Sequence, residues 1–232
     1  MKKFLVVACT FAVGMAVTSQ SRADITVTSA ETRADVSDAS TLSFVSDGSS
    51  SLTGATVFAM LPGFSSMHTS AYSSTVLSNT FSQTRLGGLD DYSYGFGFSY
   101  FTANANDAYS ISGSFTNSDG FNYFHAYLYD LTNSAYEFYN VQYNFGGTTQ
   151  SLGNTSGNYY NELQGSLTGY LTAGNQYVWL ANAYTQAYPS ADTGATASGS
   201  TLFQLNSIPE PSSLALLGIA GVGIMLYRRR KG

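Results

Sequence analysis

The residues of this chain that could do chemistry are few, and their spacing argues against a reaction centre. His68 and His125 are the only histidines, and neither stands at a spacing typical of metal ligands. His125 lies between Phe124 and Ala126 in an apolar run, which favours a satisfied histidine within a β-sheet over a ligand or a base. No Gly-x-Ser-x-Gly segment supports a serine nucleophile. We therefore expect no catalytic residues and no enzyme activity.

Acidic and amide side chains offer only an incomplete cation site. Asp90 and Asp91 are adjacent, so in a strand they would point to opposite faces, and a solvated loop is the better interpretation than a paired-carboxylate hydrolase site. Two other groups supply oxygen ligands on expected loops, namely Asn117 with Asp119 and Gly120, and Asn104 with Asn106 and Asp107. Neither completes a Ca²⁺ loop with a bidentate acid. We predict no cofactor and no metal-binding residue, while one structural Ca²⁺ without assigned ligands stays an open alternative.

Aromatic residues at every second position are the clearest structural signal in the chain. Between positions 92 and 100, Tyr92, Tyr94, Phe96, Phe98 and Tyr100 alternate with Ser, Gly, Gly and Ser. This period of two predicts a strand with all five rings on one face. The favoured interpretation places that face in the core. The alternative is an exposed stripe that stacks on sugar rings and reaches sugar hydroxyls through the tyrosines.

Similar short apolar segments separated by turn residues continue along the chain. We expect strands at Thr56–Leu61, Tyr109–Phe115, Phe121–Leu131, Tyr136–Phe145, Leu163–Leu171, Gln176–Ala187 and Ser200–Leu205, with one more strand within residues 24–50. Residues 191–199 are expected to be flexible. About eight strands at mainly hairpin spacing predict an all-β fold, a single antiparallel β-sandwich that is jelly-roll-like and spans residues 24–207. Leu163–Leu171 and Gln176–Ala187 are expected to form a hairpin, with Trp179 in the core. Within it, the segment Leu171–Leu180 resembles a hairpin found in extracellular sandwich and sugar-binding-type modules.

Charge is distributed very unevenly over the 232 residues. Seven of the nine Lys and Arg residues lie in the first 23 or the last 25 positions. Residues 24–207 carry thirteen acids against Arg33 and Arg85 alone, a formal charge of −11. Such a domain lacks the clustered cations that nucleic acid requires. It also disfavours charge-driven binding of anionic polymers.

The N-terminal segment has the three parts of a secretory signal peptide. Lys2 and Lys3 form a basic start, residues 4–17 are apolar, and Ser21-Arg22-Ala23 places small residues three and one before a cut. We predict a signal peptide over residues 1–23, export by the Sec machinery, and cleavage between Ala23 and Asp24. The single cysteine, Cys9, would leave with it, so no disulfide is expected.

The C-terminal segment also has three parts in order. Pro209-Glu210-Pro211 should be extended, because each proline fixes φ and removes a backbone donor. Residues 212–227 carry no charge and predict a transmembrane helix roughly 24 Å long, which snorkelling residues and bilayer thinning can accommodate. Arg228, Arg229, Arg230 and Lys231 then form a basic membrane stop that keeps the C-terminus cytoplasmic.

This arrangement over residues 208–232 resembles the PEP-CTERM sorting signal of Gram-negative bacteria that make exopolysaccharide. The resemblance implies processing by exosortase, a membrane enzyme, with Pro209, Glu210 and Pro211 as recognition residues. It also implies transient anchoring in the inner membrane, followed by a place at the cell surface or in the extracellular matrix. The leading hypothesis is a structural, non-enzymatic surface or exopolysaccharide-matrix protein. The alternative is a carbohydrate-binding or adhesin module that acts through surface tyrosines.

Overall fold

The computed structural model describes residues 24–39, 41–85, 91–118, 121–145, 149–154, 161–186 and 195–206. They fall within one compact unit, Ala23–Asn206. These residues form fourteen β-strands and no helix, so the all-β prediction is confirmed. Period-two patterning in the sequence is the physical reason, because it gives each strand two faces of different character.

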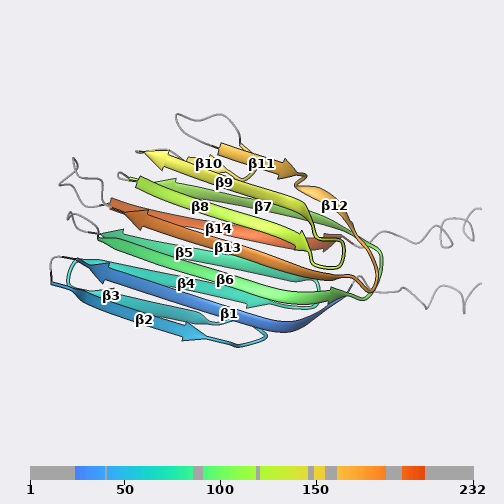
Figure 1. Ribbon diagram of the computed structural model, residues 1–232, viewed down its shortest axis with the longest axis horizontal. Coiled ribbons are helices and arrows are strands. Elements are labelled where there is room, and N and C mark those ends of the chain that lie inside the picture. Colours follow the sequence, from blue (N-terminus) through green and yellow to red (C-terminus); the bar gives the residue numbers. More distant parts are fainter. Residues whose placement is uncertain are drawn as a thin grey trace, which may run out of the picture. The chain divides into compact units, whose positions relative to one another are not determined.

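The strands form two antiparallel sheets, here called sheet A and sheet B (Figure 1). Sheet A contains β1 (Ile25–Asp38), β2 (Ser43–Ser49), β6 (Tyr92–Ala103), β8 (Phe121–Asp130), β9 (Ala135–Phe145), β11 (Asn161–Gly165) and β13 (Gln176–Gln186), in the spatial order β11-β9-β8-β13-β6-β1-β2. Sheet B contains β3 (Thr56–Leu61), β4 (Phe64–Tyr72), β5 (Val76–Arg85), β7 (Asp107–Asn117), β10 (Thr149–Ser151) and β14 (Ala195–Asn206), in the order β10-β7-β14-β5-β4-β3, with β12 (Thr168–Leu171) paired to β7.

Consecutive strands in the middle of the chain lie in different sheets. From β5 to β8 the chain alternates between sheet B and sheet A. The last two strands then insert between them: β13 lies between β6 and β8, and β14 lies between β5 and β7. The central strands of both sheets are therefore paired by the final segment of the domain, whose contacts are far apart in sequence.

The two sheets pack face to face through an aromatic core. Phe81 of β5 and Phe115 of β7 each lie 5.5 Å, centroid to centroid, from Phe124 of β8 in the other sheet. Trp179 of β13 is fully buried and lies 6.0 Å from Phe203 of β14. The expectation that Trp179 fills the core is confirmed.

Beside this apolar core lies a layer of buried polar side chains. His68 of β4 is completely buried, and its Nε2 lies 3.3 Å from Asn79 Oδ1 of β5. Tyr72 donates to the same oxygen at 3.4 Å. Across the interface, β6 presents Gly97 to this layer; a Cβ there would overlap Asn79 Oδ1 and lie 3.0 Å from His68 Nε2 and from the Tyr72 hydroxyl oxygen. Glycine is required because the opposite sheet already fills the space.

The alternation in β6 is therefore the reverse of the favoured prediction. Ser93, Gly95, Gly97 and Ser99 face the interior, whereas the five aromatic rings lie on the outer face of sheet A. The prediction that the rings form a core face is wrong. The physical reason is volume: large side chains from β4 and β5 leave room only for small residues opposite them.

Several expected connections also differ. The predicted hairpin of residues 163–187 is wrong, because β12 pairs with β7 in sheet B whereas β13 lies in sheet A. Gly165 has a φ of 71° and ends β11 before the chain crosses between the sheets. Residues 195–199, expected to be flexible, are part of β14. Residues 24–50 contain two strands instead of one.

Candidate binding face

The outer side of sheet A carries a continuous layer of aromatic side chains. Along β6, the rings of Phe96 and Phe98 are 5.9 Å apart and almost parallel, at 5°. Tyr94 contacts Phe96 at 5.6 Å, and Tyr100 contacts Phe98 at 5.5 Å. Because neighbours pack side by side, four of the five rings are only partly exposed, and Tyr100 is 39% exposed.

The layer extends from β6 over three further strands. The β-ladder places Tyr184 of β13 beside Tyr94, and Tyr123 of β8 beside Tyr184 on its other side. Tyr143 of β9 continues that row, with its ring 5.1 Å from Tyr123. We call the whole set the aromatic face. It consists of Tyr92, Tyr94, Phe96, Phe98, Tyr100, Tyr123, His125, Tyr127, Tyr129, Tyr136, Tyr139, Tyr143, Asn182 and Tyr184.

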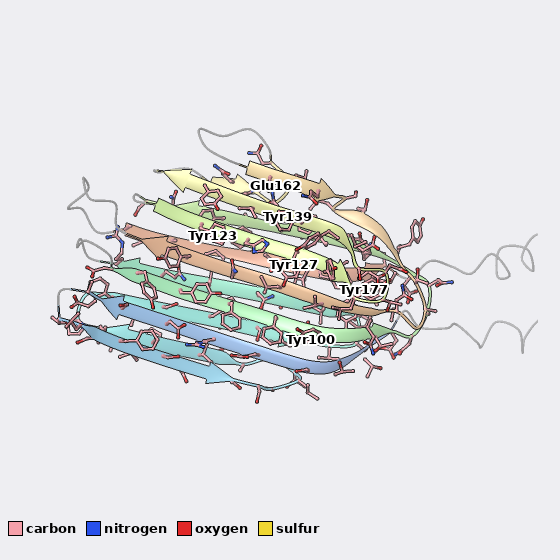
Figure 2. The ribbon with its side chains drawn as sticks, in the orientation of Figure 1. Tyr100, Tyr123, Tyr127, Tyr139, Glu162 and Tyr177 are labelled. Carbon is pink, nitrogen blue, oxygen red and sulfur yellow. The ribbon has the colours of Figure 1, made fainter. Side chains whose placement is uncertain are left out.

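Figure 2 shows the spread of this layer: Tyr100, Tyr123, Tyr127 and Tyr139 are distributed over the strands of sheet A. Tyr136 is 44% exposed and holds one side of it together through edge contacts with Tyr129 at 4.8 Å and Tyr139 at 5.0 Å. A contiguous, partly exposed aromatic layer on one face of a domain is typical of an interaction surface.

Two polar side chains lie within the aromatic face, directly opposite each other on paired strands. His125 of β8 is the register partner of Asn182 of β13. The His125 ring lies 5.1 Å from the ring of Tyr127 and 5.0 Å from that of Tyr139. Burial among these rings lowers the pKa of His125 to about 4, so the imidazole is neutral at physiological pH.

Both members of this pair have a buried polar atom without a hydrogen-bond partner. These atoms are Nε2 of His125 and Oδ1 of Asn182. The other end of the Asn182 amide is engaged: burial raises the pKa of Tyr94, and a hydrogen bond from Asn182 partly offsets that shift. His125 was expected to be a satisfied sheet histidine; it does lie in a strand, but its Nε2 is unpaired, so that part of the prediction is wrong. Buried polar atoms are rarely left unpaired.

Charge is confined to the margins of the aromatic face. Among the described outer side chains at register-paired positions of β6, β8, β9 and β13, none is acidic or basic at neutral pH. On one side β1 contributes Glu31 and the ion pair of Arg33 with Asp35, 2.9 Å apart. On the other side stands Glu162 of β11, labelled in Figure 2. Tyrosine hydroxyls and the His125–Asn182 pair are thus the polar groups within the face.

The outer side of sheet B has a different composition. Its three central strands present mainly hydroxyl side chains, namely Ser78, Thr80, Ser82 and Thr84 on β5, Ser110, Ser112, Ser114 and Thr116 on β7, and Thr196, Ser198 and Ser200 on β14. A small apolar group lies nearer the edge, where Phe58 of β3 stands opposite Met67 of β4. The aromatic face has no equivalent in the described part of sheet B.

The other candidate residues from the sequence do not lie together in one site. His68 is in the interior and His125 on the outer face of the other sheet. Asp91, expected in a solvated loop, is 2% exposed and accepts the Ala39 N–H at 2.8 Å, so that expectation is wrong. Asp90, Asp119 and Gly120 lie outside the described residues.

Of the two groups of oxygen ligands, one has both its amides bound to other parts of the chain, and Asn117 of the other is buried in β7. Asn106 accepts the Ala173 N–H at 2.7 Å, and Asn104 bonds Thr26, so both amides hold neighbouring chain segments together. Asp107 is buried, which raises its pKa, and the nearby Asp24 carboxylate adds to that shift. No group of three or more His, Cys, Asp or Glu side chains suited to a metal ion occurs among the described residues.

The terminal predictions fall outside the described part of the chain. This holds for Ala23 in the predicted cleavage site, for Pro209, Glu210 and Pro211, and for the basic stop Arg228, Arg229, Arg230 and Lys231. It also holds for the predicted transmembrane helix over residues 212–227. Within the described ranges, no helical segment has the length and hydropathy to cross a bilayer.

The described residues form an all-β domain, and the sequence continues beyond its last strand. Comparison with family models identifies this continuation: residues 207–231 match the PEP-CTERM protein-sorting motif, as the sequence predicted. The match includes the Pro209-Glu210-Pro211 motif and the basic stop. It supports a protein that is exported, processed by exosortase, and sorted to the surface or a membrane-associated place.

Comparisons of the whole chain with known proteins do not identify the β-domain. The chain matches no curated protein. A solved structure of the infectious bursal disease virus Gx strain is similar over 81% of this chain, at 11% sequence identity and a TM-score of 0.26. The match spans 53% of that viral chain, about half of its length.

Proposed function

We propose that this chain is a non-enzymatic surface or exopolysaccharide-matrix protein of a Gram-negative bacterium. The signal peptide over residues 1–23 directs export, and the helix over residues 212–227 anchors the chain transiently in the inner membrane. Exosortase then processes it at Pro209-Glu210-Pro211. The observation that carries this proposal is the PEP-CTERM match over residues 207–231.

The sorting step is tested by Glu210→Ala in a strain that contains exosortase. Glu210 is the only charged residue between Ser207 and the basic stop, so its removal should trap an uncut, membrane-bound form. Ser213→Ala is the matched control and should be released normally. The mass of the released protein measures both cut sites at once. Unchanged release of the Glu210→Ala protein would refute the assignment.

The proposed fold is a jelly-roll sandwich. Its support is the strand order, which is β5-β14-β7 in one sheet and β6-β13-β8-β9 in the other. This order arises when a long antiparallel ribbon winds between the sheets and its last two strands insert between earlier ones. Alternation of β5 to β8 between the sheets follows from the same winding. A scaffold of this kind leaves two broad outer faces, and in the described part of the chain the outer face of sheet A is the aromatic one.

Several observations favour a non-enzymatic role. The two histidines lie in different sheets, one inside and one on the outer face, so they cannot act on one substrate. Burial lowers the pKa of each to about 4, which leaves both as weak bases. Incubation with polysaccharides should release no new reducing ends, whereas sustained release would contradict the proposal.

A second candidate function is a carbohydrate-binding or adhesin module that uses surface tyrosines. The aromatic face favours it, since tyrosine rings pack on apolar C–H surface while their hydroxyls reach sugar hydroxyls. Retention of the full chain on immobilised polysaccharides tests this function. Failure to bind any of a broad panel would leave the structural role alone.

A further inference from the structure

We propose that the aromatic face binds an uncharged polysaccharide, and that the His125–Asn182 pair supplies its central hydrogen bonds. This inference rests on the binding function proposed above and names both the ligand class and the residues that contact it. Three observations carry it: the unpaired polar atoms, the rings that surround them, and the distribution of charge.

The unpaired atoms indicate a ligand that both donates and accepts hydrogen bonds. Asn182 Oδ1 accepts only, whereas the neutral His125 ring offers one donor and one acceptor nitrogen. A sugar hydroxyl can donate to the amide oxygen and either donate to or accept from the imidazole. Both atoms are covered in the free domain, so a sugar reaches them as a neighbouring ring such as Tyr127 or Tyr139 turns aside. An apolar partner would leave both atoms unpaired, which is costly.

The surrounding rings provide the apolar part of the same site. Tyr127 and Tyr139 contact the His125 ring, and Tyr94 and Tyr123 flank the pair in the next row of the sheet. A polysaccharide combines C–H surface with hydroxyl groups, and so matches a face that combines rings with hydroxyls. The layer covers four strands, which provides room for several sugar units in a row.

Charge selects the class of polymer. The described outer side chains at register-paired positions of the four central strands are uncharged, and the acids Glu31 and Glu162 stand at opposite margins. Glu137 is the unpaired, half-buried residue at the bulge of β9, at the end of the layer beside Tyr136, and burial raises the pKa of its carboxyl. The domain as a whole carries −11. An anionic polymer or a second copy of the domain would therefore be repelled, whereas a neutral glycan would not.

The test uses the full-length chain in a polyoxyethylene detergent, whose headgroup is not a sugar. Affinity electrophoresis is run in gels that contain dextran, galactomannan or mixed-linkage β-glucan as neutral polymers, and alginate as the anionic one. At least one neutral polymer should retard the protein, and alginate should not. The variants are His125→Phe and Asn182→Leu, which keep the bulk of each side chain but remove its unpaired polar atom.

Each variant should weaken binding about fivefold, and the double variant more than tenfold, because hydrogen bonds to the sugar are lost. His125→Phe should in addition unfold at an equal or higher temperature, since it removes a buried unpaired atom. This opposite response separates a binding role from a structural one. Tyr170→Ala is the matched control: Tyr170 is 69% exposed on β12 of sheet B, and its loss should leave binding unchanged.

The possible failures are distinct. If no neutral polymer retards the protein, the binding function itself is wrong. If a neutral polymer binds but His125→Phe and Asn182→Leu bind equally well, the function stands and the assigned residues are wrong. Equal retardation by alginate would overturn the selection by charge. A concentration-dependent dimer that Tyr127→Glu abolishes would show that the face serves self-association instead.

Discussion

The outer faces of the two sheets have the same backbone pattern and opposite chemistry. In sheet A, β6 places tyrosine and phenylalanine outward at every second position, and β8 places tyrosines there with His125 among them. In sheet B, β5 and β7 place serine and threonine there. Alternation fixes which residues share a face, but it does not determine which face is buried. The domain therefore presents one aromatic outer surface, on sheet A, and one surface of small hydroxyl side chains, on sheet B.

The interior explains why the two outer faces can differ so strongly. In the middle of the molecule, sheet B supplies the bulk, with His68, Asn79 and Phe81, whereas β6 supplies Gly95 and Gly97. Only the sum of the two volumes has to match. Large rings were therefore free to lie outside in sheet A. Four expected outcomes test this division of roles, from the largest to the smallest effect.

Gly97→Val should cause the largest loss of stability, about 3 kcal/mol, because its side chain would enter the space of Asn79, His68 and Tyr72. Phe96→Leu, at the neighbouring outward position, should cost less than about 1 kcal/mol. Urea denaturation of both variants measures the difference in free energy of unfolding. Equal stability of the two would contradict the assignment of inner and outer faces in β6.

Acid should weaken the fold through His68. Burial lowers its pKa to about 4 from 6.5, although a hydrogen bond to Asn79 opposes that shift. The unfolded chain therefore binds a proton first, and stability falls as the pH drops from about 6.5 to about 4. For this completely buried side chain the loss is on the order of 3 kcal/mol.

His125 acts in the same direction, with a smaller effect because it is partly exposed. Denaturation curves at pH 7.5, 5.5 and 4 measure the total effect. His68→Gln should flatten the pH dependence more than His125→Phe does. If His125→Phe flattened it more, the interior polar layer would not be the main source of acid sensitivity.

Tyr127→Ala should reduce retention by neutral polysaccharide about tenfold, because it removes a ring that contacts both His125 and Tyr136. The near-ultraviolet circular dichroism spectrum should stay that of a folded protein. Tyr170→Ala, which removes a more exposed tyrosine from the other sheet, should retain wild-type binding. If both variants bound alike, the side of the molecule would not matter.

Thr80→Ala, in the hydroxyl face of sheet B, should have the smallest effect. Thr80 is exposed on β5 opposite Ser200 of β14, so its loss should change the free energy of unfolding by less than about 0.5 kcal/mol. Binding to polysaccharide should not change. A clear loss of binding would place the functional surface on sheet B.

The sequence was sufficient for much of the fold. Period-two patterns located β3, β6, β8 and β9, and the position of Trp179 in the core followed from its strand. The C-terminal motif was recognisable because its order of parts is specific. Crossings between the sheets could not be predicted, because turn residues mark a change of direction and say nothing about the sheet that receives the next strand.

The aromatic face was within reach of the sequence, but its rings were assigned to the wrong side of the sheet. Five aromatic residues in a row suggested a core, since apolar burial is the common outcome. The evidence against a core face lay in the residues between the rings, Ser93, Gly95, Gly97 and Ser99. These small residues allow close packing against large side chains of the opposite sheet. The pairing of His125 with Asn182 required the β8–β13 register, which no local pattern contains.

The inward glycines of β6 have an evolutionary consequence. Because Gly95 and Gly97 mediate the contact with the opposite sheet, the rings at 94, 96 and 98 can be exchanged without disturbing the interior. Selection on ligand preference and selection on folding then act on separate sets of codons within one strand. Under the proposed polysaccharide binding, the ligand preference of such a strand can change while the scaffold stays the same.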